Sequence, residues 1–296
     1  MRPEVFITII IPSFNAETHI LHCLESIMNQ SFEDFEIMII DGLSTDNTLG
    51  VVKSIAMGNE KISFISEKDA GVYDAMNKGI ERATGEWLLF LGSDDQLYDN
   101  NILSRMAAVL KPSLSDFVYG NVKIIGTTAW AKDGDIYDGE FSLERLFEKN
   151  ICQQGIFYRK TVFSKLGNYN IDYKTSADWD LNHRCFAFAK VQYQDEIVSR
   201  FFAGGVSTKS NNDKFTSEDI VLNLKKYHKT GYFNKLYRQY SWVFFNISNK
   251  FLGEGKYFKS FYFLFFSVWH TGKKATVLKN YLNNFLRLNR YNYARR

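Results

Sequence analysis

Hydrophobic positions in the first third of the chain fall into short continuous runs, separated by stretches in which they recur at helical spacing. In residues 16–29, for example, Ile20, Leu24 and Ile27 share one helical face. We predict strands at Val5–Ile11, Phe35–Ile40, Ile62–Ser66 and Glu86–Leu91, and helices at Ala16–Asn29, Thr45–Met57, Val72–Ala83 and about Asn100–Leu110. This alternation indicates an α/β fold with a mostly parallel central sheet and helices on both faces.

Polar residues follow three of the predicted strands at the point where each strand ends. They are Ser13-Phe14-Asn15, the segment Asp41 to Asp46, and Ser93-Asp94-Asp95. The carboxyl ends of parallel strands meet at one edge of a sheet, and ligands bind at that edge in open α/β proteins. The sequence therefore predicts a binding site there.

The strongest chemical signal is the pair of carboxylates after the apolar run Trp87–Leu91. Asp94 and Asp95 are adjacent, and two neighbouring carboxylates repel each other unless a cation offsets their charge. Oxygen ligands of this kind suit Mg²⁺ or Mn²⁺, which in turn suit a substrate that carries phosphates. The alternative is an acidic turn that caps the helix near Asn100.

Composition limits the class of protein. A chain of 296 residues with 45% hydrophobic content can bury a large core. Its three cysteines, Cys23, Cys152 and Cys185, have no metal-ligand spacing, so we interpret them as reduced core thiols of a cytosolic protein. Residues 1–4 lead directly into the first strand, so we expect no signal peptide. No apolar stretch reaches the length needed to span a membrane. The five histidines lack the spacing of metal ligands.

Charge is distributed unevenly along the chain. From Lys225 onward there are 15 Lys and Arg but a single acidic residue, Glu254, and aromatic residues such as Trp242 and Trp269 are interleaved with them. This composition suits an anionic membrane surface. A helical appendage that packs on the main domain explains it equally well, and nucleic acid explains it less well.

Several motifs, in order, resemble family 2 glycosyltransferases of the GT-A fold. They are Ile9–Asn15, Ile39–Thr48 and Ser93–Asp95, and the segment Ser66–Ile80 is similar to the bacterial subgroup that builds surface polysaccharides. The resemblance covers roughly residues 5 to 210. It implies an inverting transfer from a nucleotide-diphosphate sugar, usually UDP-linked, to a glycan acceptor that we expect to be lipid-linked. It also implies Mn²⁺ or Mg²⁺ as cofactor.

The resemblance also implies roles for residues near the donor. Pro12 ends the first strand, and the backbone of Phe14 and Asn15 lines the nucleoside pocket. Asp41 accepts hydrogen bonds from the base or ribose, and Asp69 contacts the base.

Further roles concern the diphosphate. On the same resemblance, Asp94 holds the ribose or assists the metal, and Asp95 binds the metal. The metal offsets the charge that builds up on the departing nucleoside diphosphate. Lys78 adds a cation near the phosphates, although a solvated helix position is the alternative reading of this residue.

On the acceptor side, an inverting displacement needs a general base that takes the proton of the acceptor hydroxyl. The family places it at the start of a helix in the second half, where this chain has Asp178 and Asp180. We predict Asp178 as the base and Asp180 as the fallback, since residues two apart face different sides of a helix. The alternative is that Asp178 only caps its helix.

The segment Cys152-Gln153-Gln154 is similar to one that usually reads Cys-His-Gln in the subgroup. The histidine position holds Gln153, whose amide carries no proton at neutral pH. We therefore expect Gln153 and Gln154 to act only by hydrogen bonding on the acceptor side.

We predict a glycosyltransferase domain at residues 1–215, with a nucleotide-sugar half (about 1–98) and an acceptor half (about 99–215). Residues 216–296 form a helical, basic and aromatic appendage. The expected location is cytoplasmic, peripheral on the inner membrane face, with no nucleic acid partner. A dehydrogenase is excluded because the turn after the first strand has no Gly-x-Gly. A non-catalytic nucleotide- or glycan-binding module on the same fold stays open.

Overall fold

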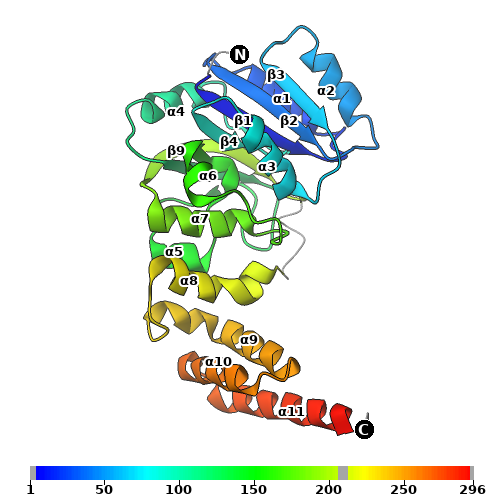
Figure 1. Cartoon of the computed structure of the whole chain (residues 1–296). Coiled ribbons are helices and arrows are strands. Elements are labelled where there is room, and N and C mark those ends of the chain that lie inside the picture. The colour runs from blue at the N-terminus through cyan, green and yellow to red at the C-terminus, as the bar shows by residue number, and fades with distance from the viewer. Residues whose placement is uncertain (1–4, 206–212, 294–296) are drawn as a thin grey trace. The chain divides into compact units, whose positions relative to one another are not determined.

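The computed structural model describes residues 5–205 and 213–293. The chain forms two compact units, residues 1–211 and 212–296 (Figure 1). Each unit is described by itself.

The first unit is built on one sheet whose strand order is β3-β2-β1-β4-β8-β6-β9-β5, with β7 paired to β6. The strands are β1 Ile7–Ser13, β2 Phe35–Asp41, β3 Ile62–Ser66, β4 Trp87–Phe90, β5 Gln96–Leu97, β6 Phe117–Ile125, β7 Ile136–Tyr137, β8 Ile156–Arg159 and β9 Val191–Phe202. From β3 to β4 all neighbours are parallel. Beyond β4 the sheet is mixed, because β8 pairs antiparallel with both β4 and β6 while β9 runs parallel to β6.

Helices cover both faces of this sheet (Figure 1). They are α1 Ile20–Met28, α2 Thr48–Ala56, α3 Val72–Arg82, α4 Ile102–Leu110, α5 Leu143–Glu148, α6 Thr161–Leu166 and α7 Ala177–Phe188. The odd-numbered residues of β1, such as Ile9, belong to one core with the buried sides of α1 and α4. On the other face Ile10 lies against α3, and the rings of Phe90 and Phe163 bring α6 onto β4. The predicted α/β fold class is therefore confirmed.

Two predicted boundaries are wrong for local reasons. The first strand does not stop before Pro12, because Pro12 and Ser13 continue the parallel ladder opposite Ile40 and Asp41. The second helix begins at Thr48 rather than Thr45, since Asp46 accepts hydrogen bonds from the Thr48 amide and hydroxyl and fixes a turn before the helix.

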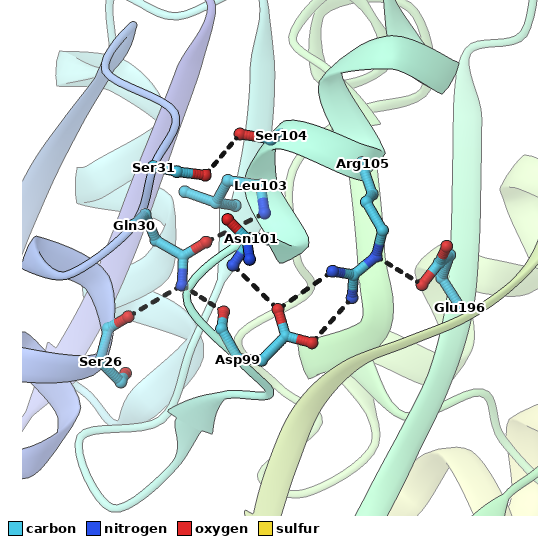
Figure 2. Close-up of polar contacts among 9 residues, drawn as sticks. All are labelled: Ser26, Gln30, Ser31, Asp99, Asn101, Leu103, Ser104, Arg105 and Glu196. Atoms are coloured by element: carbon cyan, nitrogen blue, oxygen red, sulfur yellow. Dashed lines mark hydrogen bonds and ion pairs between the residues drawn. The ribbon is translucent and has the colours of Figure 1, made fainter.

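A polar network ties the segment after Asp95 to the rest of the unit (Figure 2). The buried Gln30 side chain accepts from the amide of Leu103 at the start of α4, 3.0 Å away, and donates to the carbonyl of Asp99 at 2.6 Å. Arg105 binds both carboxylate oxygens of Asp99 and reaches Glu196 on β9 at 2.9 Å. Helices α1 and α4 and strand β9 are thereby held together around the short strand β5.

The described part of the second unit is helical, as predicted. After a π-helical segment at Phe215–Asp219 it contains α8 Ile220–His228, a 3₁₀ segment at Lys235–Tyr240, α9 Ser241–Gly253, α10 Tyr257–His270 and α11 Lys274–Tyr293. Its interior gathers aromatic rings around Phe244. Within residues 5–205 and 213–293, no helix has the length and apolar character needed to cross a membrane.

Candidate active site

The loops that follow β1 and β2 are joined by side chains at the carboxyl edge of the sheet. The amide of Asn15 donates to Oγ of Ser44 at 2.8 Å, and that hydroxyl in turn donates to Asp41. Asp41 is fully buried and also accepts from Ser66 Oγ at 2.6 Å and from the amide of Ser44 at 3.0 Å. The positive φ of Asn15 (50°) turns the chain so that its side-chain oxygen accepts from the amide of Thr45.

Asp69 joins this group through Gly42. A Cβ at Gly42 would collide with the Asp69 carboxylate, so the absence of a side chain lets the two loops approach. The same carboxylate accepts from the amide of Gly71 at 2.9 Å, immediately before α3. Asn15, Asp41 and Asp69, which the sequence predicted to contact the nucleoside, are thus brought together as one connected set.

Pro12 and Phe14 lie beside that set. Pro12 is buried in β1, and Phe14 is 62% exposed directly after the strand. Lys78 does not present a free cation: its ammonium donates to the carbonyl of Lys68 at 2.6 Å and pairs with Glu67 and Asp74 at 3.3 and 3.6 Å. Those two carboxylates offset its charge, so the geometry does not favour Lys78 as a phosphate ligand.

Asp94 and Asp95 converge after β4. Asp95 Oδ2 and Asp94 Oδ1 lie 2.6 and 2.8 Å from the point where a Cβ on Gly92 would stand. A side chain at this position would collide with both carboxylates, so glycine is what allows the two to approach each other here. Asp95 is buried, whereas Asp94 is partly exposed.

Asp95 is held in place by neutral donors. The amide of Phe202 donates to Oδ1 at 2.9 Å, and Nε2 of Gln154 donates to Oδ2 at 2.7 Å. Burial, reinforced by the nearby charge of Asp94, raises the pKa of Asp95 to about 7. The structure thus assigns Gln154 to the orientation of this carboxylate.

The chemistry of this pair fits a divalent cation. No cluster of three or more His, Cys, Asp or Glu side chains suited to a metal occurs in the described part of the chain. Mg²⁺ and similar ions need only one or two protein carboxylates when phosphates and water complete the coordination shell. Asp94 and Asp95 supply two carboxylates, whose oxygens converge near Gly92.

Asp178 lies at the start of α7 and makes two contacts with distant elements. The hydroxyl of Tyr73, on α3, donates to its Oδ1 at 2.7 Å, and Nδ2 of Asn150 donates to its Oδ2 at 2.7 Å. Burial raises the pKa of Asp178 to about 6, and these two hydrogen bonds counteract part of that rise. A carboxylate with this pKa is ionised at neutral pH yet basic enough to accept a proton.

Asn150 is itself fixed by a chain of buried amides. Its Oδ1 accepts from Asn182 Nδ2 at 2.8 Å, and Oδ1 of Asn182 accepts from the Tyr158 hydroxyl at 3.0 Å. The orientation of the Asp178 carboxylate is therefore set by β8 and α7 as well as by α3.

The Asp94–Asp95 pair and Asp178 belong to the same region of the unit. The thiol of Cys152 is within electrostatic range of both Asp95 and Asp178, and burial raises its pKa well above the usual range. Tyr73 follows Asp69 by four positions and reaches Asp178, which connects the nucleoside group to the predicted base.

Two of the predicted acceptor-side residues are instead turned inward. Asp180 is buried and pairs with Arg184, whose Nη2 lies 2.9 Å away, and the same guanidinium binds the carbonyls of residues 166–168. Gln153 is also buried and donates to the Tyr169 hydroxyl at 2.5 Å. Both side chains make internal contacts, which do not favour the predicted substrate role for either of them.

Sequence reasoning missed three groups that shape the site. Tyr73 belongs to the segment Ser66–Ile80, which resembles the family, but nothing in the sequence assigns this tyrosine a role. Nothing in the residues around Asn150 or Phe202 predicts that they contact a carboxylate. Backbone amides and single asparagines are visible as partners only once long-range packing is known.

Comparisons with known proteins agree with this geometry. A family model described as Glycosyl transferase family 2 matches residues 8–168. A Mycobacterium bovis protein named PGL/p-HBAD biosynthesis glycosyltransferase is 45% identical over 207 residues, which cover 68% of this chain and 78% of the relative.

Solved structures share the fold. S. aureus TarS 1-349 in complex with UDP-GlcNAc superposes with a TM-score of 0.70 at 15% identity, covering 98% of this chain and 92% of that one. The chain spans 54% of a longer TarS structure. A Pyrobaculum calidifontis mannosyltransferase in complex with GDP-Man and Mn²⁺ gives a TM-score of 0.55 at 14% identity, covering 94% of this chain and 75% of that one.

Proposed function

The chain belongs to glycosyl transferase family 2 and is a glycosyltransferase, and we propose that it moves a sugar from a UDP-linked donor to a lipid-linked glycan acceptor. The UDP-GlcNAc complex of TarS supports the uridine nucleotide, and the name of the mycobacterial relative supports a role in biosynthesis. On this proposal the enzyme works peripherally on the inner face of the cytoplasmic membrane.

The nucleoside end of the donor is assigned to the group that contains Asn15, Asp41 and Asp69. Asp41 is held by three hydrogen bonds from Ser44 and Ser66, so it is preorganised before any ligand arrives. Preorganisation reduces the entropy lost on binding. The exposed ring of Phe14 and the backbone of Asn15 complete this side.

The diphosphate end is assigned to Asp94 and Asp95 with Mn²⁺ or Mg²⁺. The cation supplies Lewis-acid stabilisation of the departing nucleoside diphosphate. Gln154 and the Phe202 amide keep Asp95 aimed at this position. Asp95 is buried beside another carboxylate, and both factors disfavour its ionised form. A bound cation would stabilise that ionised form.

Transfer is proposed as a single displacement that inverts the anomeric carbon. Asp178 accepts the proton of the acceptor hydroxyl while the new C1–O bond forms and the bond to the diphosphate breaks. Tyr73 and Asn150 fix both oxygens of Asp178, so the carboxylate does not have to reorient for the proton transfer.

One observation carries the proposal: the Tyr73 hydroxyl bridges from the α3 segment beside the nucleoside group to the carboxylate of Asp178. Tyr73 lies at the start of α3, directly after the segment proposed to bind the donor, and its hydrogen bond reaches the proposed proton acceptor at the start of α7.

The first test is a thermal-shift panel of UDP, GDP, dTDP and CDP, each with and without Mn²⁺. We expect UDP to raise the melting temperature most, and only in the presence of metal, since ligands that bind the native state stabilise it. A shift by another nucleotide would correct the donor. No shift by any of them would contradict the assignment of Asp94 and Asp95.

A further inference from the structure

Helix α10 buries two serines together with Leu264 and Phe266, and it exposes most of its other large aromatic side chains. Its serines Ser260 and Ser267 are fully buried, and their hydroxyls donate to carbonyls of α9 at 2.8 Å. The outer side carries five large rings, which are 43–89% exposed and which we call the α10 aromatic face: Phe258, Phe261, Tyr262, Phe265 and Trp269. A soluble helix normally shows the opposite pattern.

The rings form a stripe rather than scattered single residues. Positions 258, 261, 265 and 269 recur at helical spacing along one side of α10. Phe233 extends the stripe, since its ring lies 6.5 Å from Phe265 and 5.3 Å from Trp269 and is 62% exposed. Contiguous exposed apolar surface of this kind marks an interaction site.

The following helix repeats the pattern with aliphatic residues. Leu278, Leu282 and Leu286 are spaced four apart on α11 and are each 43–56% exposed. Exposed lysines lie within these two helices or directly before them: Lys256, Lys259, Lys273, Lys274 and Lys279. From Lys225 onward, the second unit therefore combines apolar rows with an almost unopposed positive charge, because Glu254 is the single acidic residue after position 224.

We propose that the α10 aromatic face and the leucine row of α11 dock on the surface of an anionic lipid bilayer. Aromatic rings partition into the headgroup region, leucines reach the acyl boundary, and lysines bind anionic headgroups. A second copy of this chain carries the same positive charge at this surface and is therefore disfavoured as the occupant. Nucleic acid would match the charge but gains nothing from a row of leucines.

This inference deepens the proposed function, since an enzyme held at such a surface meets lipid-linked acceptors, and it names the lipid chemistry and the residues that bind it. It does not depend on catalysis. If the protein transfers sugar but does not bind vesicles, only the proposed docking surface is overturned. If it binds vesicles but transfers no sugar, only the proposed function is overturned.

The test is flotation of the full-length protein with vesicles of phosphatidylcholine alone and of phosphatidylcholine mixed equally with phosphatidylglycerol. We expect binding to the anionic vesicles at low salt and at least a tenfold weaker partition at about 0.5 M salt. The triple variant Phe258→Ser/Phe265→Ser/Trp269→Ser should lose at least tenfold in partition. Its matched control replaces equally exposed residues of the first unit: Met57→Ser/Leu114→Ser/Phe188→Ser.

A charge variant separates the electrostatic contribution from the apolar one. Lys274→Glu/Lys279→Glu should also reduce binding to anionic vesicles, while Lys53→Glu/Lys174→Glu, at exposed sites of the first unit, should not. These surface changes should leave the circular dichroism melting curve unchanged.

Two results would overturn the proposal. One is equal flotation of the triple variant and its control. The other is sedimentation showing dimers of the wild type that the triple variant abolishes, together with no vesicle binding at low salt, which would make the α10 aromatic face a contact between copies.

Discussion

At the scale of single residues, the two carboxylates with raised pKa values differ in their neighbours. Asp95 is buried beside Asp94, so its ionised form would be stabilised by a nearby cation. Asp178 is surrounded by neutral donors, which makes it a suitable proton acceptor. Asp180, two positions further, is neutralised by Arg184 and can do neither. Environment, and not residue type, separates these roles.

Replacing Asp178 by Asn tests the proposed base. The amide keeps the size of the side chain but accepts no proton, so we expect transfer to fall by about 10²- to 10⁴-fold. The thermal shift with UDP and Mn²⁺ should stay at the wild-type value. A protein that is only a binding module would show no transfer before the substitution and no change after it.

The pH profile of transfer tests the same residue differently. With donor and Mn²⁺ saturating, the rate should fall about tenfold per unit below a pH of about 6, because Asp178 becomes protonated there. Tyr73→Phe removes a hydrogen bond that lowers the pKa of Asp178, so the acid limb should move to higher pH. Tyr193→Phe, which removes a hydroxyl bound to Asn121 and Asp195, is the control and should leave the limb in place.

At the scale of elements, short connections hold the site. Gln30, just after α1, accepts from the first turn of α4, and Arg105 on α4 ties that helix to β9 (Figure 2). Strand β9 in turn delivers the Phe202 amide to Asp95. The position of Asp95, which we propose to bind the metal, therefore depends on a network that contains no predicted catalytic residue.

Gln30→Ala should lower the free energy of unfolding by about 1–3 kcal/mol. The substitution leaves the buried amide of Leu103 without its acceptor. Ser31→Ala is the matched control, because it loses one exposed hydroxyl contact with Ser104 and should change the free energy by less than about 0.5 kcal/mol. Chemical denaturation measures both, and equal values would show that Gln30 does not hold α4.

Trp130 is placed to affect the acceptor. Trp130 is 43% exposed, and its ring centroid lies 5.0 Å from that of Tyr137 and 5.5 Å from that of Phe201. Tyr137 donates to the carbonyl of Asn150, and Phe201 precedes the Phe202 amide that binds Asp95. Trp130→Ala should raise the acceptor KM roughly threefold to tenfold while the donor KM stays constant. An equal rise in both would contradict an acceptor role.

At the scale of the whole molecule, the two units carry different chemistry. Every residue proposed to bind donor or take part in transfer lies within 1–211, whereas the exposed aromatic and basic surface lies within 212–296. Binding of nucleotide and binding of lipid are therefore expected to be separable.

Hydrogen exchange can test this separation. UDP with Mn²⁺ should slow exchange in the segments 41–46, 67–74 and 92–96, with no change in α10. Anionic vesicles should slow exchange in α10 and α11 and leave those three segments unaffected. Protection of both units by either ligand alone would contradict the division of labour.

The sequence by itself determined the parallel half of the sheet, the family, and the carboxylates at the ends of β2 and β4. These depend on local patterns: buried runs, helical spacing, and polar residues at strand ends. The mixed half of the sheet was not predicted, because the pairing of β8 with β4 and β6 joins segments far apart in the chain.

Only the tertiary structure decided how the carboxylates differ. Asp178 and Asp180 look alike in the sequence, yet packing gives one Tyr73 and Asn150 as neighbours and the other Arg184. The same holds for Gln153 and Gln154, of which one is buried against Tyr169 and the other reaches Asp95. The charge state and orientation of a polar group depend on neighbours that only folding brings near, so local sequence does not contain them.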